Sequence, residues 1–137
     1  MGNDVPKQKL DPDFPKGRLH VSKAASSGWV VGLRDFFEYR DLGIAEATKG
    51  KVLAHVIRAR KPCAGAGETH YHKLDFQMVY VLKGWMEVGF GDRAPERFSA
   101  GDCFYQEPGI HHTVTAYADD LEVIEITVPA DFETVTL

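Results

Sequence analysis

Residues 77–90 read QMVYVLKGWMEVGF, and this stretch decides the fold class. Two runs rich in valine and aromatic residues stand on either side of a Lys-Gly pair at 83–84, which is typical of a tight turn. Successive side chains of an extended chain point to opposite faces, so we expect Gln77, Val79 and Val81 to face inward together. The stretch predicts a β-hairpin, and with it a protein built from strands.

The same strand pattern continues on both sides of residues 77–90. Residues 51–60 alternate between two faces, and residues 121–128 form a long β-branched run that ends at Pro129. Many short strands without a long amphipathic helix favour an all-β sandwich or barrel, and the pattern alone does not separate these two. Further short strands are predicted at 96–98, 103–106 and 111–117, with glycines and prolines between them.

Length and composition predict one structured domain. The chain has 137 residues, which fits a single domain over residues 28–137. Residues 1–27 combine prolines, lysines and small residues without an apolar period, which predicts a flexible, extended N-terminal arm.

Charge and hydropathy narrow the possible partners. Sixteen basic residues against twenty acidic ones give a net charge of −4, which argues against a nucleic-acid surface. We find no apolar run long enough to span a membrane and no apolar core of a secretory signal, so we expect a cytoplasmic protein. Two cysteines are too few for a disulfide framework.

The sharpest local signal is His70-Tyr71-His72. Residues two apart face the same side of an extended chain, so both imidazoles can reach one ion. His112, at the start of a later strand, is a third candidate ligand, and neutral imidazole is a common ligand for divalent transition metals. A pair of histidines by itself is a weak signal, since most histidines lie on the surface or in hydrogen bonds; we treat His20 and His55 in that way.

Two spaced motifs strengthen the metal hypothesis, because together they resemble those of the cupin superfamily, in particular its small, single-domain, RmlC-like members. The resemblance covers roughly residues 50–128. It implies a double-stranded β-helix, that is, a jelly-roll barrel, around one divalent metal ion. The first motif has glycines at 65, 67 and 84 around His70, His72 and Gln77; the second has Gly101, Pro108-Gly109 and His112.

The chain departs from the superfamily pattern at two positions. Glu107 stands where proline is commonest, but alignment on Gly109 still selects His112 as the ligand and sends His111 to the opposite face. Gln77 replaces the usual glutamate, as in some cupin isomerases and cupins that process unsaturated uronates. The resemblance therefore implies His70, His72, Gln77 and His112 as ligands; the alternative is three histidines plus water.

A neutral amide at position 77 leaves the charge of the ion uncompensated, which predicts a stronger Lewis acid and a somewhat weaker affinity for the metal. Zn, Fe, Ni, Mn and Cu all suit such ligands. Glu107 is the candidate catalytic carboxylate, and Arg58 is either a site for a substrate carboxylate or a solvated charge.

We therefore expect a metal-dependent isomerase or lyase that acts as a Lewis acid on a small oxygen-rich metabolite, similar to a sugar or a keto acid. A metal-dependent dioxygenase and a non-catalytic ligand-binding or sensing module are the alternatives. The expected partners are a small-molecule substrate and a second copy of the chain in a homodimer, with no nucleic acid and no membrane.

Overall fold

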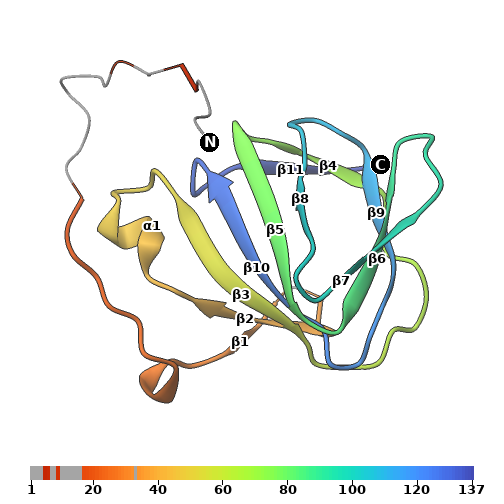
Figure 1. The fold of residues 1–137 in the computed structure, drawn as a ribbon, viewed down its shortest axis with the longest axis horizontal. Coiled ribbons are helices and arrows are strands. Elements are labelled where there is room, and N and C mark those ends of the chain that lie inside the picture. The colour runs from red at the N-terminus through yellow and green to blue at the C-terminus, as the bar shows by residue number, and fades with distance from the viewer. Residues whose placement is uncertain (1–4, 7–8, 10–16, 33) are drawn as a thin grey trace.

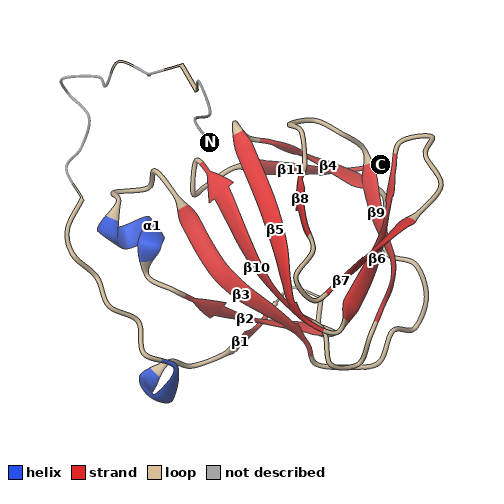
Figure 2. Ribbon diagram, in the orientation of Figure 1, coloured by secondary structure: helices blue, strands red, loops and turns tan. Residues whose placement is uncertain are grey.

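The computed structural model describes residues 5–6, 9, 17–32 and 34–137. In this part of the chain, strands form two antiparallel sheets that face each other around a common interior (Figures 1 and 2). The predicted all-β double-stranded β-helix is thereby confirmed. Residues 1–4, 7–8 and 10–16 of the predicted arm lie outside the described residues; the described part of the arm contains a short 3-10 turn at Ala24–Ser26.

The larger sheet has six strands within the described residues, and β10 lies in its centre. This sheet crosses the left and front of Figure 1, and a short helix α1 (Ile44–Ala47) lies at its outer edge. In spatial order the strands are β1 (Val30–Val31), β2 (Phe37–Asp41), β3 (Leu53–Ala59), β10 (Glu122–Val128), β5 (Phe76–Lys83) and β8 (Cys103–Tyr105).

The smaller sheet has five strands in the described chain and carries the histidines. The last strand of the chain, at Glu133–Thr136, pairs with β4 residue by residue. In spatial order the strands are β11 (Glu133–Thr136), β4 (His70–Lys73), β9 (His112–Tyr117), β6 (Trp85–Phe90) and β7 (Glu96–Ser99).

The side-chain alternation predicted for β5 is confirmed. Gln77, Val79 and Val81 are all buried, with exposed fractions of 3%, 5% and 0%, while Tyr80 and Leu82 between them are exposed on the outer face. Val79 and Val81 pack into the main core, where both sheets meet. The other core members are Met86, Val88, Phe98, Tyr117, Leu121 and Val123.

The predicted hairpin at residues 77–90 is wrong, although both of its strands exist. β5 pairs with β10 and β8, whereas β6 pairs with β7 and β9, so the chain passes from one sheet to the other at Gly84. Gly84 has a φ of +69°, and a Cβ placed there would lie 2.6 Å from Asp120 Oδ1 and 3.1 Å from the backbone of Leu121. Glycine is therefore required both by the backbone conformation and by the space.

Two further expectations about the chain can be compared with the structure. Both cysteines are free thiols. Among the described residues, the structure has no helix that is long and apolar enough to cross a membrane.

The corner at Gly84 gives a first prediction. Gly84→Ala should lower the free energy of unfolding by about 3 kcal/mol, because the new methyl group adds a steric clash to the left-handed backbone conformation. Gly91→Ala is the matched control, since Gly91 also has a positive φ, of +53°, but a Cβ there would meet nothing within 4 Å. We expect a loss of about 1 kcal/mol for the control. Urea unfolding of both variants measures the difference, and equal losses would contradict the role of Gly84.

Candidate metal centre

Three histidines meet at one end of the barrel interior. His70 and His72 lie on the inward face of β4, and His112, at the start of β9, is the direct cross-strand partner of His70. One ring nitrogen from each of the three lies within 4.8 Å of the others. His112 is buried, while His111 is exposed and stacks on Tyr71 on the outer face, so the two neighbours point to opposite faces as side-chain alternation predicts.

Backbone carbonyls fix the tautomers of two of these rings. The Nδ1 atom of His70 lies 2.9 Å from the Glu68 carbonyl oxygen, and that of His112 lies 3.0 Å from the Ile110 carbonyl oxygen. A carbonyl only accepts hydrogen bonds, so each Nδ1 carries the proton and each Nε2 keeps a free lone pair. This is how proteins orient imidazoles toward a metal ion.

The third ring is supported by the C-terminal strand. His72 Nδ1 lies 2.8 Å from the hydroxyl oxygen of Thr134 on β11. The register of the two strands places Thr134 directly opposite His72. Because this pairing joins residues 62 positions apart, sequence patterns gave no sign of it.

The donor set fits a divalent transition metal. Around an ion with metal–nitrogen bonds of about 2.0 Å, two ligand nitrogens of a tetrahedral site lie about 3.3 Å apart. The three ring nitrogens within 4.8 Å reach that spacing with small side-chain movements. Burial, with smaller contributions from the nearby His70 and His72, lowers the pKa of His112 to about 4, although the hydrogen bond to the Ile110 carbonyl opposes this shift. The pKa of His72 is lowered as well, first by burial and then by His70.

Gln77 Oε1 and His112 Nε2 both point toward the side-chain amide of Gln106. Gln106 Nε2 donates to Gln77 Oε1 over 3.0 Å and lies 3.2 Å from His112 Nε2. One NH₂ group thus bridges the two atoms that the sequence predicted as ligands. A cation placed between them would satisfy the same two acceptors.

A half-buried carboxylate, which the sequence analysis missed, hydrogen-bonds to Gln77. Glu125 on β10 accepts a hydrogen bond of 2.8 Å from Gln77 Nε2, and its other oxygen lies 2.7 Å from His55 Nε2. Burial pushes the pKa of Glu125 upward, but the hydrogen bonds and charge from His55, together with Gln77, outweigh burial and leave the pKa below its usual value. His55, which we had treated as non-functional, therefore belongs to this network.

A signal for this pair was present in the sequence. The apolar run LEVIEITV carries Glu125 in the same phase as Val123 and Thr127, which are buried, and a carboxylate in that phase needs a partner. Glu125 and His55 are direct cross-strand neighbours. Recognising the partner required the pairing of β3 with β10, which is a long-range contact.

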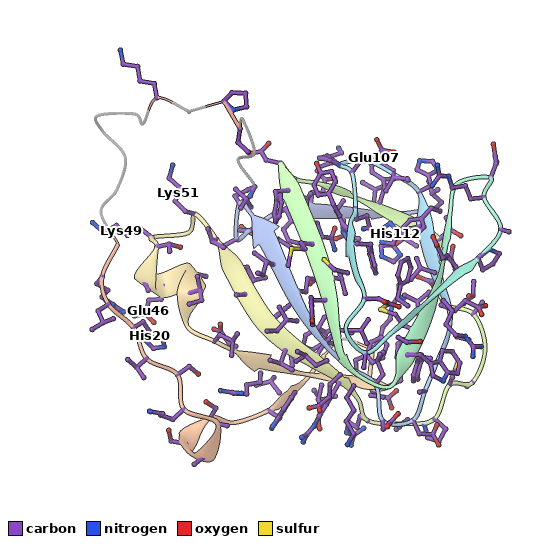
Figure 3. All side chains as sticks on the ribbon, viewed as in Figure 1. His20, Glu46, Lys49, Lys51, Glu107 and His112 are labelled. Carbon is purple, nitrogen blue, oxygen red and sulfur yellow. The ribbon has the colours of Figure 1, made fainter. Side chains whose placement is uncertain are left out.

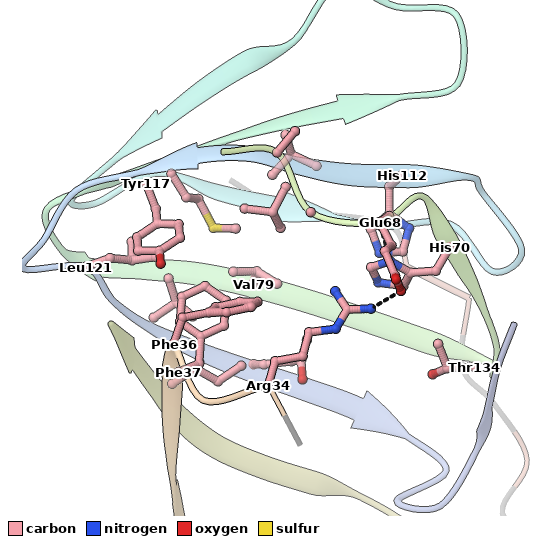
Figure 4. Close-up of a pocket in the computed structure, with 18 of the residues that line it drawn as sticks. Arg34, Phe36, Phe37, Glu68, His70, Val79, His112, Tyr117, Leu121 and Thr134 are labelled. Atoms are coloured by element: carbon pink, nitrogen blue, oxygen red, sulfur yellow. Dashed lines mark hydrogen bonds and ion pairs between the residues drawn. The ribbon is translucent and has the colours of Figure 1, made fainter. Parts of the chain in front are cut away.

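The histidines open onto a cavity of about 870 Å³ between the two sheets. Figure 4 shows that the cavity has two unlike ends. The three histidines lie at the polar end, together with Gln77, Gln106 and Glu125, which hydrogen bonds connect to His112. Phe36, Phe37, Tyr117 and Leu121 lie at the apolar end, with Val79 between the two ends. Arg34 reaches toward the histidines and forms an ion pair of 2.8 Å with Glu68.

Two other predicted site residues lie away from this cavity. Glu107 is exposed and does not line the cavity; Figure 3 places it at the upper edge of the barrel, whereas His112 lies within. A catalytic role for Glu107 stays a prediction. Arg58 pairs with Glu38 and lies 3.8 Å above the ring of Trp29, so it also stays outside the cavity.

The low pKa of His112 predicts how the stability of the metal-free protein depends on pH. The unfolded chain takes up a proton near pH 6.5, while folded His112 resists protonation until about pH 4. Stability is therefore full above pH 6.5 and falls as the pH is lowered toward 4, with roughly 3 kcal/mol lost in total. His72 acts in the same direction. Urea unfolding in the presence of a chelator measures this loss.

The window from pH 6.5 to 5 isolates the histidines, because Glu125 has a pKa below its ordinary value of 4.5. We expect His112→Gln to flatten the pH profile in this window. A wild-type profile that is already flat there would contradict the assignment.

Comparisons with known proteins agree with this architecture. Residues 60–128, a little over half of the chain, match the cupin domain family. No curated protein matches the sequence.

Three solved structures show the same fold. The polyketide cyclase RemF from Streptomyces resistomycificus superposes with a TM-score of 0.72 at 15% identity, over 88% of this chain and 86% of its own. KdgF from Halomonas sp. gives 0.66 at 21%, over 80% and 94%. An RmlC-like cupin from Shewanella frigidimarina gives 0.63 at 21%, over 85% and 96%. The family match and the shared fold lead to one conclusion: the chain belongs to the cupin domain family.

Proposed function

We propose that this cupin is a divalent-metal-dependent enzyme that acts as a Lewis-acid isomerase or lyase on a small oxygen-bearing metabolite. The observation that carries the proposal is the set of three imidazoles, two of them anchored through Nδ1 to backbone carbonyls, which face one another at the end of a cavity. When bound, the ion supplies a positive charge that polarises a carbonyl or hydroxyl oxygen.

We assign the ligand positions to His70, His72, His112 and Gln77. The geometry around Gln106 supports Gln77 as the fourth ligand, since Gln77 Oε1 and His112 Nε2 both accept from one NH₂ group. For a cation to be held by these two atoms, Gln106 would have to turn its amide away from them. Gln77 Nε2 stays bonded to Glu125, which keeps Oε1 directed toward the histidines.

The charge around the site differs from the sequence expectation. Gln77 is neutral, but it donates to the carboxylate of Glu125 and so brings a negative charge within one hydrogen bond of the predicted ligand. The positive charge of an ion is thereby compensated from outside the ligand set. Glu125 lines the cavity, as Asp35 and Glu68 do, whereas Glu107 does not, so Glu125 is a better placed proton acceptor than Glu107.

The decisive experiment begins with elemental analysis of protein purified without chelators, followed by assays with unsaturated uronates and related keto acids. We expect about one equivalent of a divalent metal, and turnover that falls by more than about 100-fold in His112→Ala. His111→Ala is the matched control, because its ring lies on the outer face against Tyr71. Turnover that is unchanged in His112→Ala would rule out participation of the metal.

The support of His72 by Thr134 gives a separate prediction. Thr134→Val removes the hydroxyl that orients His72 and should weaken metal affinity by about 10-fold. Thr136→Val is the control: Thr136 also lines the cavity on β11, but its hydroxyl forms no hydrogen bond within the described part of the chain. Competition with a metal-sensitive dye measures both affinities, and equal losses would contradict a specific role for Thr134.

A metal-dependent dioxygenase is the second candidate function. The carboxylate of Glu125, which hydrogen-bonds to Gln77, supports this candidate, because a nearby negative charge helps to stabilise a higher oxidation state of a metal ion. Oxygen uptake with a flavonol or a diketone separates this candidate from the first, and tight ligand binding without any chemical change would indicate a sensing module. The homodimer and the cytoplasmic location stay predictions from the sequence.

A further inference from the structure

The cavity is built from two chemically different halves. Figure 4 shows His70, His112 and Thr134 at one end and Phe36, Phe37, Tyr117 and Leu121 at the other. The proposed function uses only the polar end. The apolar end adds a large surface that the fold does not fill: Phe36 and Phe37 are half-buried and line the cavity although they pack against the core.

Three aromatic rings at the apolar end form a compact group. The centroids of Phe36 and Phe37 are 4.9 Å apart in an edge-on arrangement, and those of Phe37 and Tyr117 are 5.0 Å apart. Phe36 and Tyr117 are nearly parallel, with 6.4 Å between centroids. Such spacings are those at which a further aromatic ring gains from stacking and edge contacts as well as from burial.

The polar groups near these rings are already engaged. The hydroxyl of Tyr117 donates its proton to the Lys61 carbonyl oxygen over 3.0 Å, so only its oxygen remains as an acceptor. The charged side chains of Asp35 and Lys61 pair with each other, and both are at least half exposed to solvent. Several ligand hydroxyls placed among these rings would therefore lose more hydrogen bonds to water than they gain from the protein.

We propose that the cavity takes a ligand with two parts: two adjacent oxygens held at the three histidines, and a flat apolar ring body packed against Phe36, Phe37 and Tyr117. The oxygen-binding half rests on the proposed function, while the ring-binding half rests on the apolar end alone. A volume of about 870 Å³ is ample for a molecule of two or more fused rings.

This substrate class differs from a fully hydroxylated sugar. A sugar that reaches the histidines with two oxygens carries further hydroxyls toward the aromatic group, and each one left unpaired weakens binding by about tenfold. A ring body buries apolar surface at the same place and gains affinity. The cavity therefore favours a keto- or hydroxy-substituted aromatic compound.

Isothermal titration with three probes tests the proposal on the zinc-loaded and the metal-free protein. Salicylate and 3-hydroxy-2-naphthoate present the same hydroxy-carboxylate oxygens, but the naphthoate carries one more fused ring. We expect the naphthoate to bind about tenfold tighter than salicylate, and galacturonate to bind more weakly than both. A naphthoate no tighter than salicylate, or galacturonate as the tightest ligand, would overturn the proposal.

Two variants locate the ring. Phe36→Ala should remove most of the tenfold preference for the naphthoate while zinc stoichiometry stays unchanged; Phe36→Leu, which keeps the apolar volume but loses the flat ring, should reduce the preference and replaces the alanine variant if that protein does not fold. Phe76→Ala is the matched control, since Phe76 is also a half-buried phenylalanine, but it packs against Tyr105 and does not line the cavity. An undiminished preference in the Phe36 variants would refute the contact.

Measuring both the zinc-loaded and the metal-free protein distinguishes a failure of this inference from a failure of the proposed function. If the protein takes up no zinc, the proposed function fails, but the preference for the naphthoate over salicylate can still be measured on the metal-free protein. If zinc binds and the preference is missing in both forms, the proposed function stands and the aromatic substrate class is wrong.

Discussion

The pairing of β4 with β9 on one side and β11 on the other is the constraint on which the site depends. It places His70 opposite His112 and His72 opposite Thr134, so that strand register, and not the individual side chains, decides where the imidazoles meet. A shift of one residue in either pairing would turn His70 and His72 to the outer face, where Tyr71 now stacks on His111. The Nδ1 hydrogen bonds then orient all three rings, and the carbonyl partners of His70 and His112 also fix the tautomers of those two.

The larger, six-stranded sheet supplies the charged residues next to the histidines. β3 and β10 bring His55 beside Glu125, and Gln77 on β5 connects this pair to the histidine end of the cavity. A glutamate at position 77 would put a second carboxylate against Glu125 inside the barrel, and two adjacent carboxylates repel each other. The neutral amide at position 77 is therefore consistent with the half-buried carboxylate of Glu125, to which it donates a hydrogen bond.

Much of this could be predicted from the sequence, and the failures have a common physical cause. Local alternation gave the strands and the inward face of β5, and the spacing of His70, His72 and His112 gave the three imidazoles. The corner at Gly84 was read as a hairpin because both structures need the same glycine conformation, and only the partners of β5 and β6 distinguish them. Thr134 and Glu125 were missed since their roles depend on strand pairings between distant segments.

The support of His72 by Thr134 links two parts of the chain that are 62 positions apart. In the denatured chain these groups and the imidazole of His112 are not held close together. The complete set of ligands therefore exists only in the native state, which binds the ion more tightly than the denatured state does. By mass action, free metal would then raise the melting temperature of the protein in proportion to the logarithm of its concentration. Preparations that retain different amounts of trace metal would therefore differ in melting temperature even when the protein itself is the same.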